Sequence, residues 1–329
     1  MNLFTGITNL NLDYGDGNDM THNGTSRQRH ELTTPNRPTT IDFLTLIGLA
    51  LIWGSSYILI KKGLEVFSPL QVATLRLGIS ALALAPLAIV HLPKIKMKQV
   101  PMLIVIGLTG TGLPSFLFPF AQTELSSSLT GMLSALIPLC TFVLAWLFFA
   151  NRGAGPRQFL GVLMGLLGAI LLAWAAPGGG GMTTQFAYAG FIVMACFCYA
   201  ISSNLVGAYF KEMSPLTITV SSFFLVGIPA LIWAGGAGAI KATMAQAGGT
   251  AGWWALGCVV ILALVSTVLA SIIFFRMVQR TGAVFSSTVS YMVPLVALGW
   301  GLVDGEAFVA LQMPAIVLIL IGVFLSRRE

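Results

Sequence analysis

From residue 43 to residue 326 the chain alternates long apolar runs with short polar breaks. Each run spans about 18–23 residues, the length with which an α-helix crosses a hydrocarbon core of ~30 Å. Because unpaired backbone groups are costly in lipid, each run predicts a transmembrane helix. The predicted spans are residues 43–61, 70–92, 100–122, 128–149, 158–176, 187–209, 215–235, 253–275, 282–303 and 307–326.

Lysine and arginine are distributed unevenly between alternate connections. If the N-terminus is placed inside, the inner segments hold thirteen of these residues, the outer segments hold three, and Arg76 falls within a span. Basic residues concentrate on the cytoplasmic side of membrane proteins. The sequence therefore predicts an all-α integral membrane protein of ten transmembrane helices, with both termini cytoplasmic.

The composition supports a membrane location. Hydrophobic residues make up 56% of the chain and charged residues only 9%, against about 25% charged in soluble domains. The net charge of +6 follows from the basic inner connections, so no nucleic-acid partner is needed to explain it. We expect a multi-pass protein of the cell membrane, inner or plasma, with the lipid bilayer as a partner.

Residues 1–40 differ from the rest of the chain. They are rich in Asn, Thr, Gly and Asp, lack apolar periodicity, and predict a disordered cytoplasmic tail. The four cysteines lie inside apolar runs, which predicts buried thiols and no disulfide framework. No set of residues with metal-ligand spacing is found, so we expect neither a metal nor a cofactor.

The sequence contains an internal repeat. A shift of 146 residues places Trp53-Gly-Ser-Ser-Tyr57 on Tyr199-Ala-Ile-Ser-Ser203, and a shift of 156 places Pro138 on Pro294. Residues 41–176 and 187–326 thus form two predicted repeats of five spans each. Five is odd, so the second repeat must lie inverted in the membrane, as in alternating-access transporters.

The order and spacing of several motifs resemble the drug/metabolite transporter superfamily and, within it, the EamA family of ten-helix exporters. These motifs are Trp53-Gly-Ser-Ser-Tyr57, Leu75-Arg76-Leu77, the Pro138 and Pro294 spans, and Gly305-Glu306 followed by Gln312 and Gly322. Asn151-Arg152 departs from the family, which has Gly-Glu at that place. The resemblance implies an exporter of amino acids or related compounds.

Transporter sites lie near the bilayer midplane between the repeats, so polar and aromatic residues at mid-span are the candidates. Trp53, Ser56 and Tyr57 share one helical face by their spacing. Close helix packing is the alternative reason for the small residues. The predicted substrate cavity consists of Trp53, Ser56, Tyr57, Arg76, Gln122, Ser134, Tyr199, Ser203, Ser290 and Tyr291.

Arg76 is a charge inside the second span. A charge in the membrane is costly, so we expect it to face a wet cavity or an acid. The acids near the outer surface are Glu65, Glu124, Asp304 and Glu306. A clamp for a substrate carboxylate and a structural ion pair both remain open. Lys61 and Lys62 are expected to extend to the outer interface.

Pro138 and Pro294 lie at mid-span in matching repeat positions. Proline removes a backbone donor and bends a helix. The two residues are therefore candidate hinges, with a static kink as the alternative.

These features favour a secondary transporter that exports a small molecule by alternating access, not an enzyme. A coupling proton and a monomeric state are left open. One alternative is a non-transporting sensor or a channel. A lipid-modifying membrane enzyme is less favoured, because the three histidines lie in the tail or at a span end.

Overall fold

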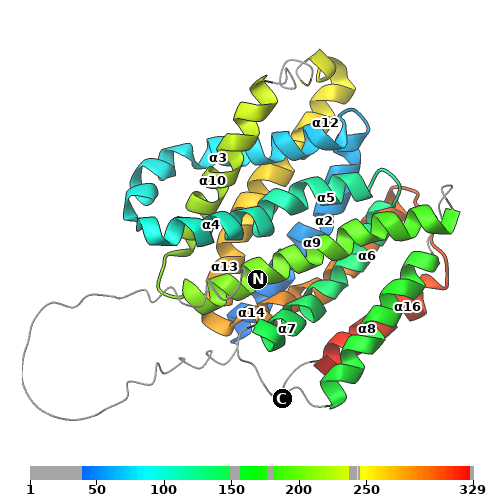
Figure 1. Cartoon of the computed structure of the whole chain (residues 1–329). Helices are drawn as coiled ribbons and strands as arrows, with labels where there is room; N and C mark the ends of the chain where they lie inside the picture. The colour runs from blue at the N-terminus through cyan, green and yellow to red at the C-terminus, as the bar shows by residue number, and fades with distance from the viewer. Residues whose placement is uncertain (1–38, 149–155, 176–180, 237–242, 244, 327–329) are drawn as a thin grey trace, which may run out of the picture.

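The computed structural model describes residues 39–148, 156–175, 181–236, 243 and 245–326. The predicted tail, apart from its last two residues, and Arg152 lie outside this range. Within it the chain forms helices joined by turns, arranged side by side as a bundle (Figure 1). For these residues the predicted all-helical fold is confirmed.

Six of the predicted spans are single helices. They are α2 (Thr40–Leu64), α3 (Pro69–His91), α8 (Pro156–Trp174), α9 (Gly181–Tyr209), α10 (Pro215–Gly236) and α16 (Gln312–Ser326). Local sequence explains where they begin: at α3, Ser68 accepts a hydrogen bond from the Gln71 backbone, and Pro69 occupies the first helical position.

Four spans are interrupted by irregular segments. The third is α4 (Val100–Gly107), the π-helical η3 (Leu108–Gly112) and α5 (Leu113–Ala121); the eighth is α12 (Gly249–Ile261), the π-helical η5 (Leu262–Leu269) and α13 (Ala270–Thr281). The fourth is α6 (Ser127–Leu133), the 3₁₀ segment η4 (Ser134–Leu136) and α7 (Ile137–Phe148); the ninth is α14 (Ala283–Ser286), the 3₁₀ segment η6 (Ser287–Tyr291) and α15 (Val293–Val303).

The irregular segments occupy matching positions of the two repeats. The 156-residue shift carries η3 into η5 and Ser134 of η4 to Ser290 of η6. In both cases the 3₁₀ segment is followed by a proline at the second residue of the next helix, Pro138 in α7 and Pro294 in α15. Since proline needs no hydrogen-bond partner in a first turn, it fits there without breaking a helix.

Eight helical spans within the described residues are long and apolar enough to cross a membrane. Two shorter apolar helices, 159–172 and 312–322, fall at the fifth and tenth predicted spans. The eighth span is longer than predicted, 249–281, and the tenth begins at Gln312 instead of residue 307. Residues before Gln312 turn instead of continuing a helix, with Gly305 at φ 76°.

Helices of one repeat pack on helices of the other in a regular scheme. The second span contacts the seventh (α3 on α10), the fourth contacts the ninth (α6 on α15), and the fifth contacts the tenth (α8 on α16). The first contacts the eighth (α2 on α12), and the third contacts the sixth (α5 on α9). A two-fold axis relating the repeats would produce this set, because it exchanges the last two contacts and maps the others onto themselves.

The α8–α16 pair is joined through glycines and lies at one side of the bundle (Figure 1). A Cβ atom on Gly322 would lie 2.4 Å from the backbone nitrogen of Gly165, and one on Gly168 would lie 2.8 Å from the nitrogen of Ile319. Small residues allow such close backbone approach in membranes. On the other side of α8, Phe159, Leu163 and Leu167 are exposed, as expected for a lipid-facing surface.

Candidate functional site

A cavity lies at the centre of the bundle, between the two repeats. It has a volume of about 870 Å³, its open mouth included. Seven of the ten predicted spans contribute side chains, so neither repeat forms the cavity alone. The lining residues are Trp53, Ser56, Tyr57, Ile60, Arg76, Gly110, Thr111, Phe118, Ser134, Ile137, Tyr199, Ser202, Ser203, Ser266, Thr267, Ser271, Phe274, Phe275, Ser287, Val289, Ser290 and Val293.

Eight of the ten side chains predicted from sequence line this cavity. Gln122 and Tyr291 do not. Tyr291, at the end of η6, packs against the hydrophobic core. Gln122 lies at the end of α5, and both polar atoms of its amide are buried without a hydrogen-bond partner among the described residues.

Two groups of contacting aromatic rings line the cavity. Trp53 meets Phe274 edge-on with ring centroids 5.1 Å apart. Tyr57 and Phe118 are 5.6 Å apart, and Phe118 and Tyr199 are 6.0 Å apart. One group joins α2 to α13 and the other joins α2, α5 and α9, and together these rings, called the aromatic wall below, offer a bound molecule a large rigid apolar surface.

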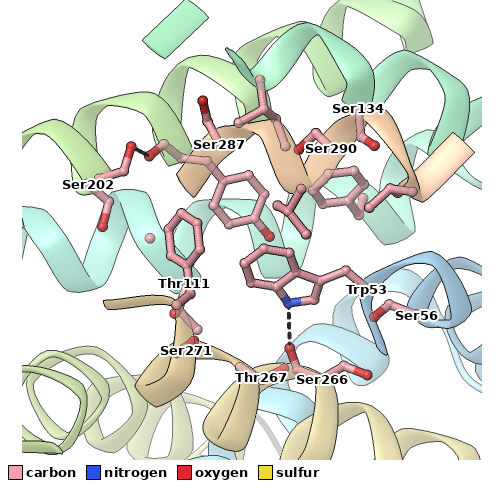
Figure 2. A pocket seen from close by; sticks show the side chains of 18 of the residues that line it. Trp53, Ser56, Thr111, Ser134, Ser202, Ser266, Thr267, Ser271, Ser287 and Ser290 are labelled. Carbon is pink, nitrogen blue, oxygen red and sulfur yellow. Dashed lines mark hydrogen bonds between the residues drawn. The ribbon is translucent and has the colours of Figure 1, made fainter. Parts of the chain in front are cut away.

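Trp53 crosses the centre of the cavity and connects the repeats. Its indole nitrogen donates to the carbonyl oxygen of Ser266 in η5 at 3.0 Å (Figure 2). A π-helical segment shifts the backbone register, and such segments are common at functional sites. Trp53 thus uses a carbonyl of the irregular segment as its anchor.

Hydroxyl groups surround these rings (Figure 2). Ser56, Ser134 and Ser203 donate to carbonyls of their own helices, at 3.1, 2.6 and 2.9 Å. The hydroxyls of Ser271 and Ser290 have no hydrogen-bond partner in the part of the chain that is described. The cavity therefore combines polar groups already satisfied by protein with others available to a ligand.

Arg76 reaches the cavity from α3 and is only 6% exposed. Its Nε donates to the Thr267 hydroxyl at 2.7 Å, and that hydroxyl donates to the Leu262 carbonyl at 2.8 Å. Among the described residues, none of the four acids considered from sequence forms an ion pair with Arg76. Three of them pair with lysines instead.

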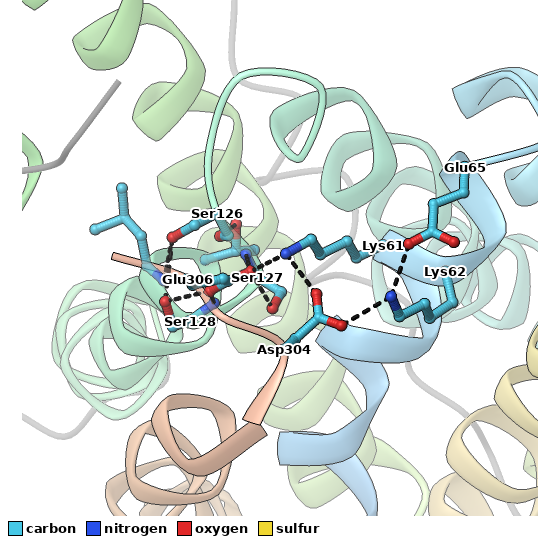
Figure 3. A network of polar contacts seen from close by, with 10 residues as sticks. Lys61, Lys62, Glu65, Ser126, Ser127, Ser128, Asp304 and Glu306 are labelled. Atoms are coloured by element: carbon cyan, nitrogen blue, oxygen red, sulfur yellow. Dashed lines mark hydrogen bonds and ion pairs between the residues drawn. The ribbon is translucent and has the colours of Figure 1, made fainter. Parts of the chain in front are cut away.

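Those lysines and acids form an ion network at the end of α2. Lys61 contacts Asp304 at 2.7 Å and Glu306 at 2.8 Å; Lys62 contacts Glu65 at 2.7 Å and Asp304 at 2.8 Å (Figure 3). The expectation that both lysines simply extend to the interface missed these pairs. We call this end of the bundle the Lys61 end.

Glu306 is the most enclosed member of the ion network, with a side chain 6% exposed. Its carboxylate accepts hydrogen bonds from the backbone N–H groups of Ser127 and Ser128, both at 2.9 Å, at the start of α6. Burial opposes ionisation, but hydrogen bonds from Lys61, Ser128 and Ser127 outweigh it and lower the pKa of Glu306 to about 2. Glu306 therefore joins the first, fourth and ninth spans as a charged helix cap.

Close helix packing continues from the ion network toward the cavity. A Cβ on Gly131 would lie 2.2 Å from the Cβ of Ala297, and one on Gly54 would lie 2.4 Å from the Cβ of Val296. Lys61 directly follows Ile60, which lines the cavity. The Lys61 end is thus tightly closed by α2, α6 and α15.

The opposite end, which we call the Asp42 end, is held differently. Arg280 contacts Asp42 at 3.3 Å with a side chain 41% exposed, and Phe43 meets Phe285 at 5.7 Å. The Asp42 side chain in this pair is only 5% exposed, so one of the two charges is buried. Both ends therefore connect α2 to the second repeat, by an ion pair at the Asp42 end and by a network of several charges at the Lys61 end.

The sequence prediction missed the contribution of the eighth span. Ser266, Thr267, Ser271 and Phe274 all line the cavity. The repeat carried a usable signal, because the 156-residue shift pairs Phe274 with Phe118, another lining residue. The face could not be read from helical periodicity, since η5 is π-helical.

Comparison with known proteins agrees with this architecture. The model of the EamA-like transporter family matches residues 40–174 and again residues 187–328. An uncharacterized transporter of Bacillus subtilis, YdfC, is 25% identical over 77% of this chain and 78% of its own length. An uncharacterized transporter of Archaeoglobus fulgidus is 20% identical over 84% of this chain and 95% of its own length.

Two further similarities concern either the overall fold or only a part of the chain. One solved crystal structure has a TM-score of 0.59 and 17% identity, covering 88% of this chain and 99% of that one. The WAT1-related protein At1g01070 of Arabidopsis thaliana is 30% identical over 37% of this chain and 36% of its own length. Since the family model covers most of the residues from 40 to 328, the chain belongs to the EamA-like transporter family.

Proposed function

We propose that this membrane transporter exports amino acids or related amphiphilic compounds across the cell membrane by alternating access. The observation that carries the proposal is the central cavity, which both repeats line and which combines an aromatic wall with hydroxyl groups. Such a site suits a small molecule with an apolar part and a few polar groups.

Alternating access requires two halves that move about a fixed site. The paired contacts between the repeats and the matching irregular segments of the third and eighth spans support two inverted copies. The 3₁₀ segments before Pro138 and Pro294 support these prolines as hinges, because the helical hydrogen-bond ladder is already interrupted there.

With both termini in the cytoplasm, as the basic residues favour, the Lys61 end faces outward. The ion network and the Gly54 and Gly131 contacts then close the outer side of the cavity. Export requires these contacts to open while the Asp42 end closes. Among the described residues that line the cavity there is no carboxylate.

Counterflow in proteoliposomes tests this proposal. Vesicles containing the purified protein are preloaded with one unlabelled amino acid at a time, and uptake of a trace of the same labelled compound is followed. We expect transient accumulation that saturates with concentration for at least one amino acid or close relative, because a carrier exchanges substrate through a reorienting site. Flux that never saturates, or no flux across the whole panel, would contradict the proposal.

A further inference from the structure

We propose, resting on the transport function above, that the cavity recognises its substrate by a carboxylate group and that Arg76 binds that carboxylate. The proposal starts from charge. Arg76 is the one charged side chain among the described residues that line the cavity, and no aspartate or glutamate lines it. A cation enclosed by apolar surroundings without an acid partner favours the entry of an anion.

The guanidinium group has donors to spare. Arginine carries five N–H donors, of which Nε–H is used by Thr267. Among the described residues the Tyr199 hydroxyl is a further hydrogen-bond partner of the Arg76 side chain, and no acid lines the cavity beside it. These two bonds leave donors unused on a side chain that lines the cavity, and the planar fork of a guanidinium matches a carboxylate.

The group is also held in place before any ligand arrives. Thr267 donates its own proton to Leu262, so its oxygen is oriented to accept from Arg76. Both Thr267 and Leu262 belong to the π-helical η5. The Tyr199 hydroxyl accepts a hydrogen bond from the Arg76 side chain and can donate its own proton to the same carboxylate.

The repeat argues against a purely structural role for this arginine. Its counterpart at the 146-residue shift is Ser222, which is 1% exposed and donates to the carbonyl of Ile218 in its own helix. A five-span repeat can thus pack with a small residue at this place. Only the first repeat carries a charge at this position, and that residue, Arg76, lines the cavity.

The remaining lining indicates what the rest of the substrate looks like. The Trp53–Phe274 and Tyr57–Phe118 pairs offer apolar surface beside Arg76. No acid is available among the described lining residues to pair with an ammonium group. We infer that the carboxylate is required and the amino group is not. A single lining cation matches a substrate with one negative charge.

Binding to the purified full-length protein tests this inference, with the ligand-induced rise in melting temperature as the measurement. The probes are the twenty amino acids, their carboxamides and their deaminated carboxylic acids. We expect the bound compounds to be carboxylates. The carboxamide of each should bind at least about thirtyfold more weakly, because it leaves the buried guanidinium unpaired. The deaminated acid should bind within about tenfold of the amino acid, since no ammonium partner is lost.

Variants give a second, independent measurement. Arg76→Gln should weaken carboxylate binding by at least about thirtyfold. Arg76→Lys should weaken it by less, because lysine keeps the positive charge and loses only the two-pronged geometry of the guanidinium. The matched control is Arg276→Gln, which removes the same charge from an exposed position outside the cavity. If Arg76→Gln does not fold, the inference is still tested by whether the parent protein binds each carboxylate more tightly than its carboxamide.

The outcomes separate this inference from the transport proposal. A carboxamide that binds as tightly as its acid, or a parent protein that binds no carboxylate of the panel, overturns the role of Arg76. Saturable counterflow of a carboxamide or another relative that lacks the carboxylate can persist in either case, and the transport proposal then stands. If carboxylates bind through Arg76 but no compound shows saturable counterflow, the binding site stands and the transport proposal fails.

Discussion

Trp53→Ala is expected to lower the rate of saturable counterflow at least about tenfold, because large aromatic anchors dominate binding sites. The substitution removes the ring that crosses the cavity, its edge-on contact with Phe274 and its hydrogen bond to the Ser266 carbonyl. That bond is also a direct tie between α2 and η5. Binding affinity and the reorientation of the two repeats should therefore both suffer.

Two variants separate these effects. Trp53→Phe keeps an aromatic ring but removes the N–H donor, so we expect an intermediate rate. Trp254→Ala removes the same side chain from a position that is 67% exposed on α12, and serves as the control. Initial rates of labelled-substrate uptake are compared at equal amounts of reconstituted protein. Equal rates for Trp53→Ala and Trp254→Ala would show that the central tryptophan has no role in transport.

The ion network at the Lys61 end gives the second large effect. Glu306→Ala is expected to lower the free energy of unfolding by ~3 kcal/mol, since removing one partner of a buried charge pair leaves the others uncompensated. The substitution leaves Lys61 with Asp304 only, and leaves two backbone donors at the start of α6 without their acceptor. Glu124→Ala, at an exposed acid of the same end, is the control.

The pH dependence of this effect has a defined sign. The pKa of Glu306 is lowered from 4.5 to about 2, so its ionised form stabilises the folded protein at every pH above 4.5. That contribution is lost as the pH falls from about 4.5 through about 2, when the carboxylate becomes protonated. Melting temperatures of detergent-purified parent and Glu306→Ala should therefore converge in acid. A difference that stays constant from pH 7 to pH 2 would exclude the ionised carboxylate as its cause.

Much of the fold was predictable because a helix that crosses a lipid bilayer needs an apolar run of defined length. Run lengths placed the helices, and the spacing of Trp53, Ser56 and Tyr57 placed one face of α2 correctly on the cavity. The rules failed where the helix departs from regular geometry. The π-helical η5 changes the helical register within it and after it, so Thr267 in η5 and Phe274 beyond it could not be assigned to a face by counting.

Charge partners were harder to predict than helices. Arg76 and the acids of the outer connections are all near one end of the bundle in the sequence-based arrangement, and pairing between them was a reasonable expectation. In the structure Lys61 reaches Glu306 across 245 residues of sequence, and Arg76 reaches Thr267 across 191. Which of two nearby cations an acid selects depends on side-chain reach in three dimensions, and the sequence alone does not contain that information.

The central claim is that transported molecules occupy the cavity between the repeats, and one labelling measurement tests it most directly. Ser271→Cys places a thiol in the half-buried wall of the cavity, while the four native cysteines are buried. Modification by a small thiol reagent is followed in proteoliposomes with and without a compound that shows counterflow. We predict that modification stops counterflow of the variant and that the compound slows modification in proportion to its occupancy. Complete modification that leaves saturable counterflow unchanged, at a rate the compound does not alter, would contradict the assignment of this cavity as the transport site.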